Sequence, residues 1–166
     1  MNAGGAHVSQ SEIASRRRIR LRLQVMNAAR LRSPHDKVGG LFHFGRMIDK
    51  IRVNALSPLG ENYEPFMGKG FDGRVCNFLK ISYPELRDFV LANPDADADA
   101  LFNWALSRGR RPDDEEIFNF NEFVRKYGWN DEATDRLKWR KETSGLAHRD
   151  DIVTMFQYID ADEGRG

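Results

Sequence analysis

Residues 37–56 read KVGGLFHFGRMIDKIRVNAL and contain the clearest helical pattern in the chain. With 100° between successive residues, the apolar side chains fall within one arc of about 140° on a helical wheel. That arc holds Val38, Leu41, Phe44, Gly45, Ile48, Ile51, Ala55 and Leu56. The pattern predicts an amphipathic helix from about Lys37 to Leu56 that packs on a core. Because the Gly39-Gly40 pair weakens the first turn, a start at Leu41 is the alternative.

The same helix carries charged residues on two faces. Its polar face is formed by His43, Arg46, Lys50 and Asn54. Arg52, however, falls inside the apolar arc, and Asp49 lies at the border of that arc. A guanidinium that faces a core needs a partner, because an unpaired buried charge is costly. Two interpretations follow: Arg52 pairs with Asp49 or a loop carbonyl, or it binds the carboxylate or phosphate of a ligand.

Residues 57–73, SPLGENYEPFMGKGFDG, are rich in proline and glycine and predict a long loop. Loops of this length in a small domain are usually functional or mobile. Gly68, Gly70 and Gly73 match the spacing G-x-G-x-x-G, but no strand precedes them, which argues against a dinucleotide site. A backbone site for a smaller anion, flanked by Lys69 and Arg74, and a simple flexible turn remain the two alternatives.

After a short apolar piece, Val75–Ile81, five further helices are predicted from caps, terminating glycines and apolar periodicity. They cover approximately residues 84–92, 97–108, 112–127, 130–143 and 151–159. The sequence contains no convincing pair of strands beside these helices. The sequence therefore predicts an all-α fold: a compact bundle of about six helices with a long Gly/Pro-rich loop after the first.

Length and charge divide the chain into two parts. It has 166 residues with 26 basic and 25 acidic side chains, but residues 1–32 hold seven arginines and one glutamate. Residues 1–28 are predicted to be a disordered basic arm, and residues 29–166 a single helical domain. A docked strand or short helix is the alternative for the arm. Nucleic-acid contact through it ranks last, because no aromatic side chains accompany the arginines.

The sequence predicts neither a membrane protein nor a metalloprotein. No apolar run approaches the roughly 18 residues of a spanning helix, and no secretory stretch is present, so a cytoplasmic location is expected. One cysteine, Cys76, excludes an internal disulfide and is expected to be packed and inert. No two histidines have metal-site spacing on one helix, although a site built across helices from His35, His43 and an acid stays open. No cofactor is predicted.

Several segments resemble one protein family. They are LRSPHDKVGG (Leu31–Gly40), FHFGRMIDKIR (Phe42–Arg52) and GFDGRVCNFL (Gly70–Leu79). These segments are similar to the bacterial family catalogued as domain of unknown function 5069, and the similarity extends from about Ala29 to Arg165. The resemblance implies a small soluble bacterial protein and carries no named chemistry. It places Arg46, Asp49, Lys50 and Arg52 in the recognisable core.

Three functions are compatible with these patterns. The first is binding of a small carboxylate or phosphate between the first helix and the 57–73 loop. Its expected ligand-binding residues are Arg46, Lys50, Arg52, Lys69 and Arg74. The second is a small enzyme at the same pocket, with His43, Asp49 or Asp72 as acid or base. The third is a scaffold or nucleic-acid-associated protein that uses the basic arm. The sequence does not indicate an oligomeric state.

Overall fold

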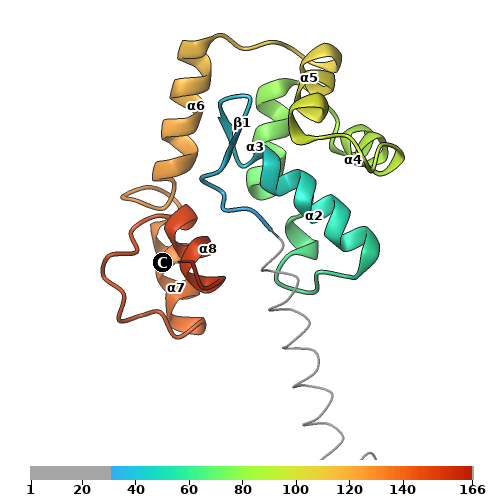
Figure 1. Cartoon of the computed structure of the whole chain (residues 1–166). Coiled ribbons are helices and arrows are strands. Elements are labelled where there is room, and N and C mark those ends of the chain that lie inside the picture. Colours follow the sequence, from blue (N-terminus) through green and yellow to red (C-terminus); the bar gives the residue numbers. More distant parts are fainter. Residues whose placement is uncertain (1–30, 166) are drawn as a thin grey trace, which may run out of the picture.

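The computed structural model describes residues 31–165, which form seven α-helices, one short 3-10 helix and a two-stranded hairpin (Figure 1). The strands are β1 (Lys37–Val38) and β2 (Leu41–Phe42). The helices are α2 (Phe44–Leu56), η1 (Glu64–Phe66), α3 (Gly70–Leu79), α4 (Tyr83–Ala92), α5 (Ala98–Arg108), α6 (Asp114–Lys126), α7 (Thr134–Thr143) and α8 (Met155–Asp162). The prediction of a compact, predominantly α-helical fold is confirmed. The predicted basic arm, residues 1–28, lies outside the described residues.

The expectations of a helix from Lys37 or Leu41 and of no paired strands are wrong. Val38 pairs with Leu41 in an antiparallel hairpin, and α2 begins only at Phe44. Gly39 and Gly40 have φ values of +56° and +82°, the left-handed conformation that a two-residue hairpin turn favours. A Cβ atom added at Gly39 would also collide with the Phe102 ring, at a distance of 2.1 Å. The glycine pair therefore turns the chain before the helix starts.

The predicted loop also ends earlier than expected, at Lys69. Gly70 and Gly73 lie within α3, which was not predicted and raises the number of α-helices in residues 31–165 to seven. Glycines lower helix propensity, so the local signal was weak. Val75 and Leu79 are four positions apart and buried in the same core cluster as α2. Packing of this apolar face stabilises a helix whose local propensity is poor.

Side-chain caps define the starts of the later helices. Asp97 accepts a hydrogen bond from the backbone of Ala100 at 2.7 Å and starts α5 at Ala98, whereas the sequence allowed either Asp97 or Asp99 as the cap. Asp113 and Glu116 form a capping box at the start of α6, two residues after the predicted start at residue 112. A second capping box, Thr154 with Gln157, starts α8 at Met155 rather than at the predicted Asp151.

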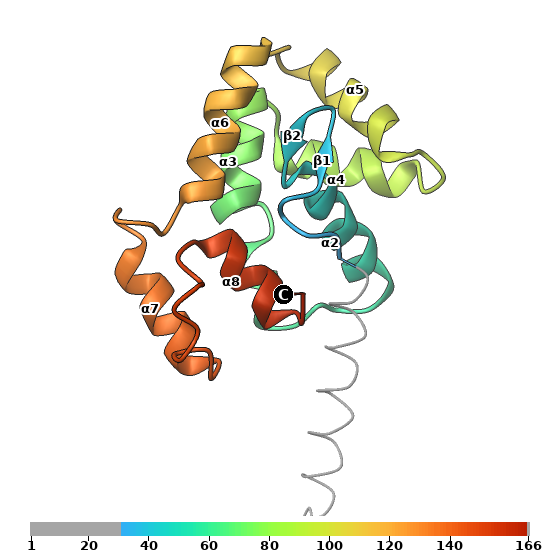
Figure 2. The same ribbon diagram turned by 60° about the vertical axis from the view of Figure 1, so that its left-hand side comes forward.

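The buried apolar side chains form two main clusters. The first joins α2 to α3, α4, α5 and the hairpin, with Phe44 and Ile48 fully buried in it. The second joins α7 and α8 to the end of α6 and includes Tyr127, Leu137 and Met155. Figures 1 and 2 both show α7 and α8 together beyond one end of α6. The candidate site lies beside the second cluster, of which Tyr127, Met155 and Tyr158 line the cavity.

Polar contacts attach α8 to the beginning of the described chain. Asp160 accepts a hydrogen bond from Ser33 Oγ at 2.7 Å and lies 2.9 Å from His35 Nδ1. Arg165 donates to the carbonyl of Leu31 at 3.1 Å. These contacts hold α8 beside the segment that leads into α2. In the described range, every helix is too short or too polar to cross a membrane.

Candidate functional site

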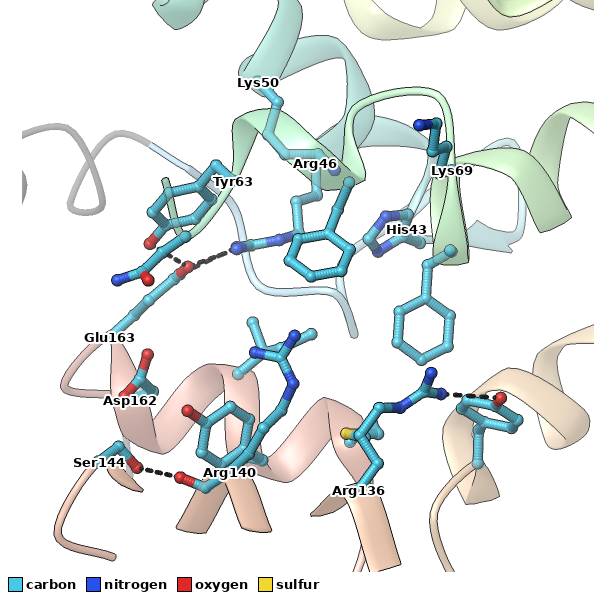
Figure 3. Close-up of a pocket in the computed structure, with 18 of the residues that line it drawn as sticks. His43, Arg46, Lys50, Tyr63, Lys69, Arg136, Arg140, Ser144, Asp162 and Glu163 are labelled. Carbon is cyan, nitrogen blue, oxygen red and sulfur yellow. Dashed lines mark hydrogen bonds and ion pairs between the residues drawn. The ribbon is translucent and has the colours of Figure 1, made fainter. Parts of the chain in front are cut away.

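A cavity of about 550 Å³ opens between α2, the segment from η1 to α3, and helices α7 and α8 (Figure 3). Six cationic side chains line it: Arg46, Lys50, Lys69, Arg74, Arg136 and Arg140. The carboxylates in the lining are Asp162 and Glu163. The aromatic lining residues, apart from His43, are Tyr63, Phe66, Phe71, Tyr127, Trp139 and Tyr158. The cavity therefore combines an excess of positive charge with aromatic surface.

Arg46 and Glu163 form a buried ion pair at one end of the cavity. Arg46 Nη1 lies 2.9 Å from Glu163 Oε2, Nη2 contacts Oε1, and both side chains are only 4% exposed. The hydroxyl of Tyr63 donates to the same carboxylate at 2.8 Å, and Arg46 Nη1 also donates to the carbonyl of Arg32 at 2.8 Å. These additional hydrogen bonds compensate the desolvation of the pair. The cluster joins α2, the loop and the end of α8.

Asp72, in the first turn of α3, holds two of the side chains that line the cavity, Lys50 and His43. Its Oδ1 accepts from Lys50 Nζ at 2.5 Å and lies 2.9 Å from His43 Nε2, while the Gly68 amide donates to Oδ2 at 3.1 Å. Burial alone would raise the pKa of Asp72, but the Lys50 ammonium and the His43 hydrogen bond outweigh it and lower the pKa to about 2. Burial also lowers the pKa of Lys50, against the attraction of Asp72. Asp72 itself is fully buried and does not line the cavity.

His43 is a neutral base in the cavity wall. It caps α2 with φ of 66°, a left-handed conformation that non-glycine residues seldom adopt. Burial lowers the pKa of His43 to about 4, despite the hydrogen bond with Asp72. Because ionised Asp72 can only accept, the proton of neutral His43 is assigned to Nε2, which leaves Nδ1 as an acceptor. Nδ1 is buried and has no hydrogen-bond partner within residues 31–165.

Lys69 and Arg74 lie on the same cavity, as predicted from their positions beside the glycines. Lys69 caps the start of α3 and is exposed. The Arg74 guanidinium lies 4.5 Å from the centre of the Tyr127 ring, and its ion-pair partner, Glu132, is 3.9 Å away and 74% exposed. The structure thus brings Arg46, Lys50, Lys69 and Arg74 together around one cavity.

Arg52 and Asp49 do not belong to that cavity, which corrects their predicted placement. Arg52 Nη2 donates to the carbonyl of Ala96 at 2.6 Å, beyond the end of α4. This is the loop-carbonyl alternative left open by the sequence. Asp49 pairs with Arg32 instead, with Nη2 to Oδ1 at 2.8 Å and Nε to Oδ2 at 2.8 Å. Both side chains therefore bond to protein groups away from the site, although Arg52 Nε is buried without a hydrogen-bond partner in residues 31–165.

The predicted site residues include none from α7, although this helix forms one wall of the cavity. Arg136, Trp139, Arg140 and Thr143 line the cavity at spacings of three, four and seven residues. This spacing places them on one face of the helix. The face looked like an ordinary solvated surface in the sequence. A signal was available, because the pattern R-x-x-W-R combines two like charges and a large aromatic with no acidic residue between them.

The remaining predicted groups have protein partners. Within residues 31–165, no three His, Cys, Asp or Glu side chains gather as a metal-binding group. His35 contacts Asp160 whereas His43 contacts Asp72, so the two histidines do not share a carboxylate. Cys76 is buried with its sulfur 3.9 Å from that of Met47, and burial raises the pKa of its thiol to about 12.

The geometry supports two kinds of chemistry. Cationic side chains at the cavity can bind an anion through charge-assisted hydrogen bonds. A neutral imidazole held by a carboxylate can accept a proton from a bound molecule.

No curated protein matches the chain. A family model described as a domain of unknown function, DUF5069, matches residues 28–165. The matched range contains every residue that lines the cavity. The chain therefore belongs to the DUF5069 family, in agreement with the resemblance of its sequence.

Proposed function

We propose that the protein binds a small anionic molecule, a carboxylate or a phosphate, in the cavity between α2, the loop that precedes α3, and α7. The observation that carries this proposal is the charge balance of the lining. Six cationic side chains share the cavity with two carboxylates, and one of these, Glu163, is already paired with Arg46. A cytoplasmic location stays a prediction from the sequence.

The cations on the open side of the cavity have the weakest protein partners. Lys69, Arg136 and Arg140 take part in no ion pair within the described part of the chain, and Arg74 has only the exposed Glu132. Asp162 acts on Arg140 at longer range. Four positive charges around one cavity repel one another, and a bound anion would relieve this repulsion. The charge arrangement therefore favours an anionic ligand over a neutral or cationic one.

The dimensions of the cavity also suit a small molecule. Pockets that bind small ligands commonly measure about 300–1,000 Å³ and place a few polar groups on an apolar lining. A volume of about 550 Å³ with aromatic walls lies within this range.

Thermal denaturation in the presence of single anions tests the proposal. We expect millimolar phosphate or a small carboxylate to raise Tm by at least about 3 °C, roughly 1 kcal/mol for a chain of this size. Arg136→Met should remove this rise. Lys138→Met is the matched control, because it removes one exposed charge from α7 outside the cavity. The proposal fails if no anion in a broad panel raises Tm, or if both variants reduce the rise equally.

A small enzyme at the same cavity is the second candidate, and one observation favours it. His43 is neutral, buried and held by ionised Asp72, which is the arrangement of a general base with an orienting carboxylate. Asp49, the other acid considered, lies in its ion pair with Arg32. NMR spectra of each binding anion, incubated with wild type and with His43→Asn, test this candidate. If wild type converts an anion to a product and the variant does so at least 100-fold more slowly, the enzyme candidate is supported. If the spectrum of every anion stays unchanged with wild type, the protein binds the anion without converting it.

The third function considered, a scaffold or nucleic-acid role of the basic arm, depends on residues 1–28 and stays a prediction from the sequence.

A further inference from the structure

Two guanidinium groups of the cavity share one aromatic ring. Arg74, on α3, lies 4.5 Å from the centre of Tyr127, and Arg136, on α7, lies 5.7 Å from the same centre. Arg136 Nη2 also donates to the Tyr127 hydroxyl at 2.9 Å. Two positive charges from different helices therefore contact the same ring. Lys69 also lines the cavity, but Figure 3 shows its ammonium directed away from Arg136.

This cluster is matched better to a phosphate than to a single carboxylate. A phosphate monoester carries about −1.5 to −2 charges at neutral pH and three acceptor oxygens, whereas a carboxylate carries one charge and two oxygens. Arginine forks recognise such groups through paired hydrogen bonds. Arg74 and Arg136 offer two such forks beside one ring.

Beside the cluster, two large aromatic side chains remain open to solvent. Trp139 is 59% exposed and Phe66 is 43% exposed, although both line the cavity. They come from opposite walls, Trp139 from α7 and Phe66 from η1. Arg140 lies 5.1 Å from the centre of the Phe66 ring, so this part of the cavity is flanked by flat groups. Flat apolar surface of this kind favours stacking of a planar ring.

The two features are adjacent along α7. Trp139 follows Arg136 by three positions, a rise of about 4.5 Å along the helix axis on the same face. One molecule of modest size can therefore contact both. We infer that the ligand is a planar aromatic molecule that carries a phosphate, of about mononucleotide size. Its phosphate lies beside Arg74 and Arg136, and its ring lies against Trp139. This inference rests on the proposed anion binding and specifies its ligand.

Titration calorimetry on the full chain with five probes tests the inference. The probes are inorganic phosphate, benzoate, phenyl phosphate, adenosine monophosphate and adenosine. We expect phenyl phosphate or adenosine monophosphate to bind at least tenfold more tightly than inorganic phosphate and benzoate. A comparison of the affinities of the two aromatic phosphates shows whether the site prefers a nucleotide or a simpler aryl phosphate.

Substitutions at Arg136 and Trp139 test where the phosphate and the ring of the ligand bind. Arg136→Met should weaken both aromatic phosphates at least tenfold and leave adenosine unchanged. Trp139→Ala should bring phenyl phosphate to the affinity of inorganic phosphate, and Trp139→Leu, which keeps apolar volume without the flat ring, should do the same if the alanine variant is unstable. Lys138→Met should change none of these affinities.

If neither aromatic phosphate binds more tightly than both inorganic phosphate and benzoate, the inference is overturned and anion binding stays in place. An aromatic preference that survives both Trp139 variants would also overturn the assigned ring site. If no anionic probe binds, the inference and the proposed function fail together.

Discussion

Arg46 and Glu163 lie 117 positions apart in the sequence and form a buried ion pair that joins α2 to the end of α8. The pair closes one end of the cavity and positions the second wall against the first. Its partners, Tyr63 and Arg165, come from the loop and from the residues after α8. One contact thereby connects the three segments on which the candidate site depends.

Removal of one partner of this pair should destabilise the protein. Glu163→Ala leaves the Arg46 guanidinium without its carboxylate, and we expect a loss of about 3 kcal/mol in the free energy of unfolding. The double variant Arg46→Met with Glu163→Leu should recover at least half of this loss, because no charge then remains unpaired. Urea denaturation followed by circular dichroism measures both. A loss below about 1 kcal/mol in the single variant would contradict the structural role of the pair.

Arg52 should contribute to stability without affecting ligand binding. Its hydrogen bond to the Ala96 carbonyl fixes the segment after α4, and Arg52→Met should cost about 1 kcal/mol. The rise in Tm produced by a binding anion should be the same in this variant as in wild type. If that rise disappears, Arg52 reaches the ligand after all and the geometry described for α2 is wrong.

Stability should fall on acidification because of His43. The pKa of His43 is about 4 in the folded protein and near 6.5 in the unfolded chain, so the unfolded state binds more protons between these values. The stabilisation is complete above about pH 6.5 and is lost as pH falls towards 4, with a slope of up to about 1.4 kcal/mol per pH unit. The groups acting on this imidazole are Asp72, Lys50 and Arg46.

The contribution of His43 can be isolated by substitution. His43→Asn tolerates the left-handed backbone and removes the titrating ring, so the slope of stability between pH 6.5 and 4 should decrease. His148→Gln is the control, because it removes an exposed histidine that lies outside the cavity. Equal slopes in wild type and His43→Asn would show that this imidazole is not desolvated in the folded state.

The hairpin turn should be sensitive to any side chain at Gly39. Gly39→Ala places a Cβ 2.1 Å from the Phe102 ring and adds the cost of a positive φ, so we expect a loss of more than about 2 kcal/mol. Gly145→Ala has the same sign of φ, at +78°, but meets nothing within 4 Å. The difference between the two variants in urea denaturation measures the steric contact. Similar losses would mean that the Phe102 ring moves aside without cost.

The positions of the cavity residues were predictable only in part. His43, Arg46 and Lys50 were recognised because they form the polar face of a strongly amphipathic helix. Lys69 and Arg74 were recognised because they flank the glycines near the start of α3. Arg136, Trp139 and Arg140 were missed, since the direction of their face depends on how Leu137 packs in the second core cluster. Arg52 and Asp49 were misplaced, because their partners, Ala96 and Arg32, lie 44 and 17 positions away.

The sequence by itself determined the helical class, the starts of α5 and α6, and most of the apolar face of α2, although Leu56 of the predicted face is 81% exposed. These features depend on side chains within one or two helical turns, such as the capping box of Asp113 and Glu116. The tertiary structure alone decided that Gly70–Leu79 is helical and that α7 faces α2 across a cavity. Each of these outcomes depends on contacts between residues distant in the chain, whose energies outweigh local propensity.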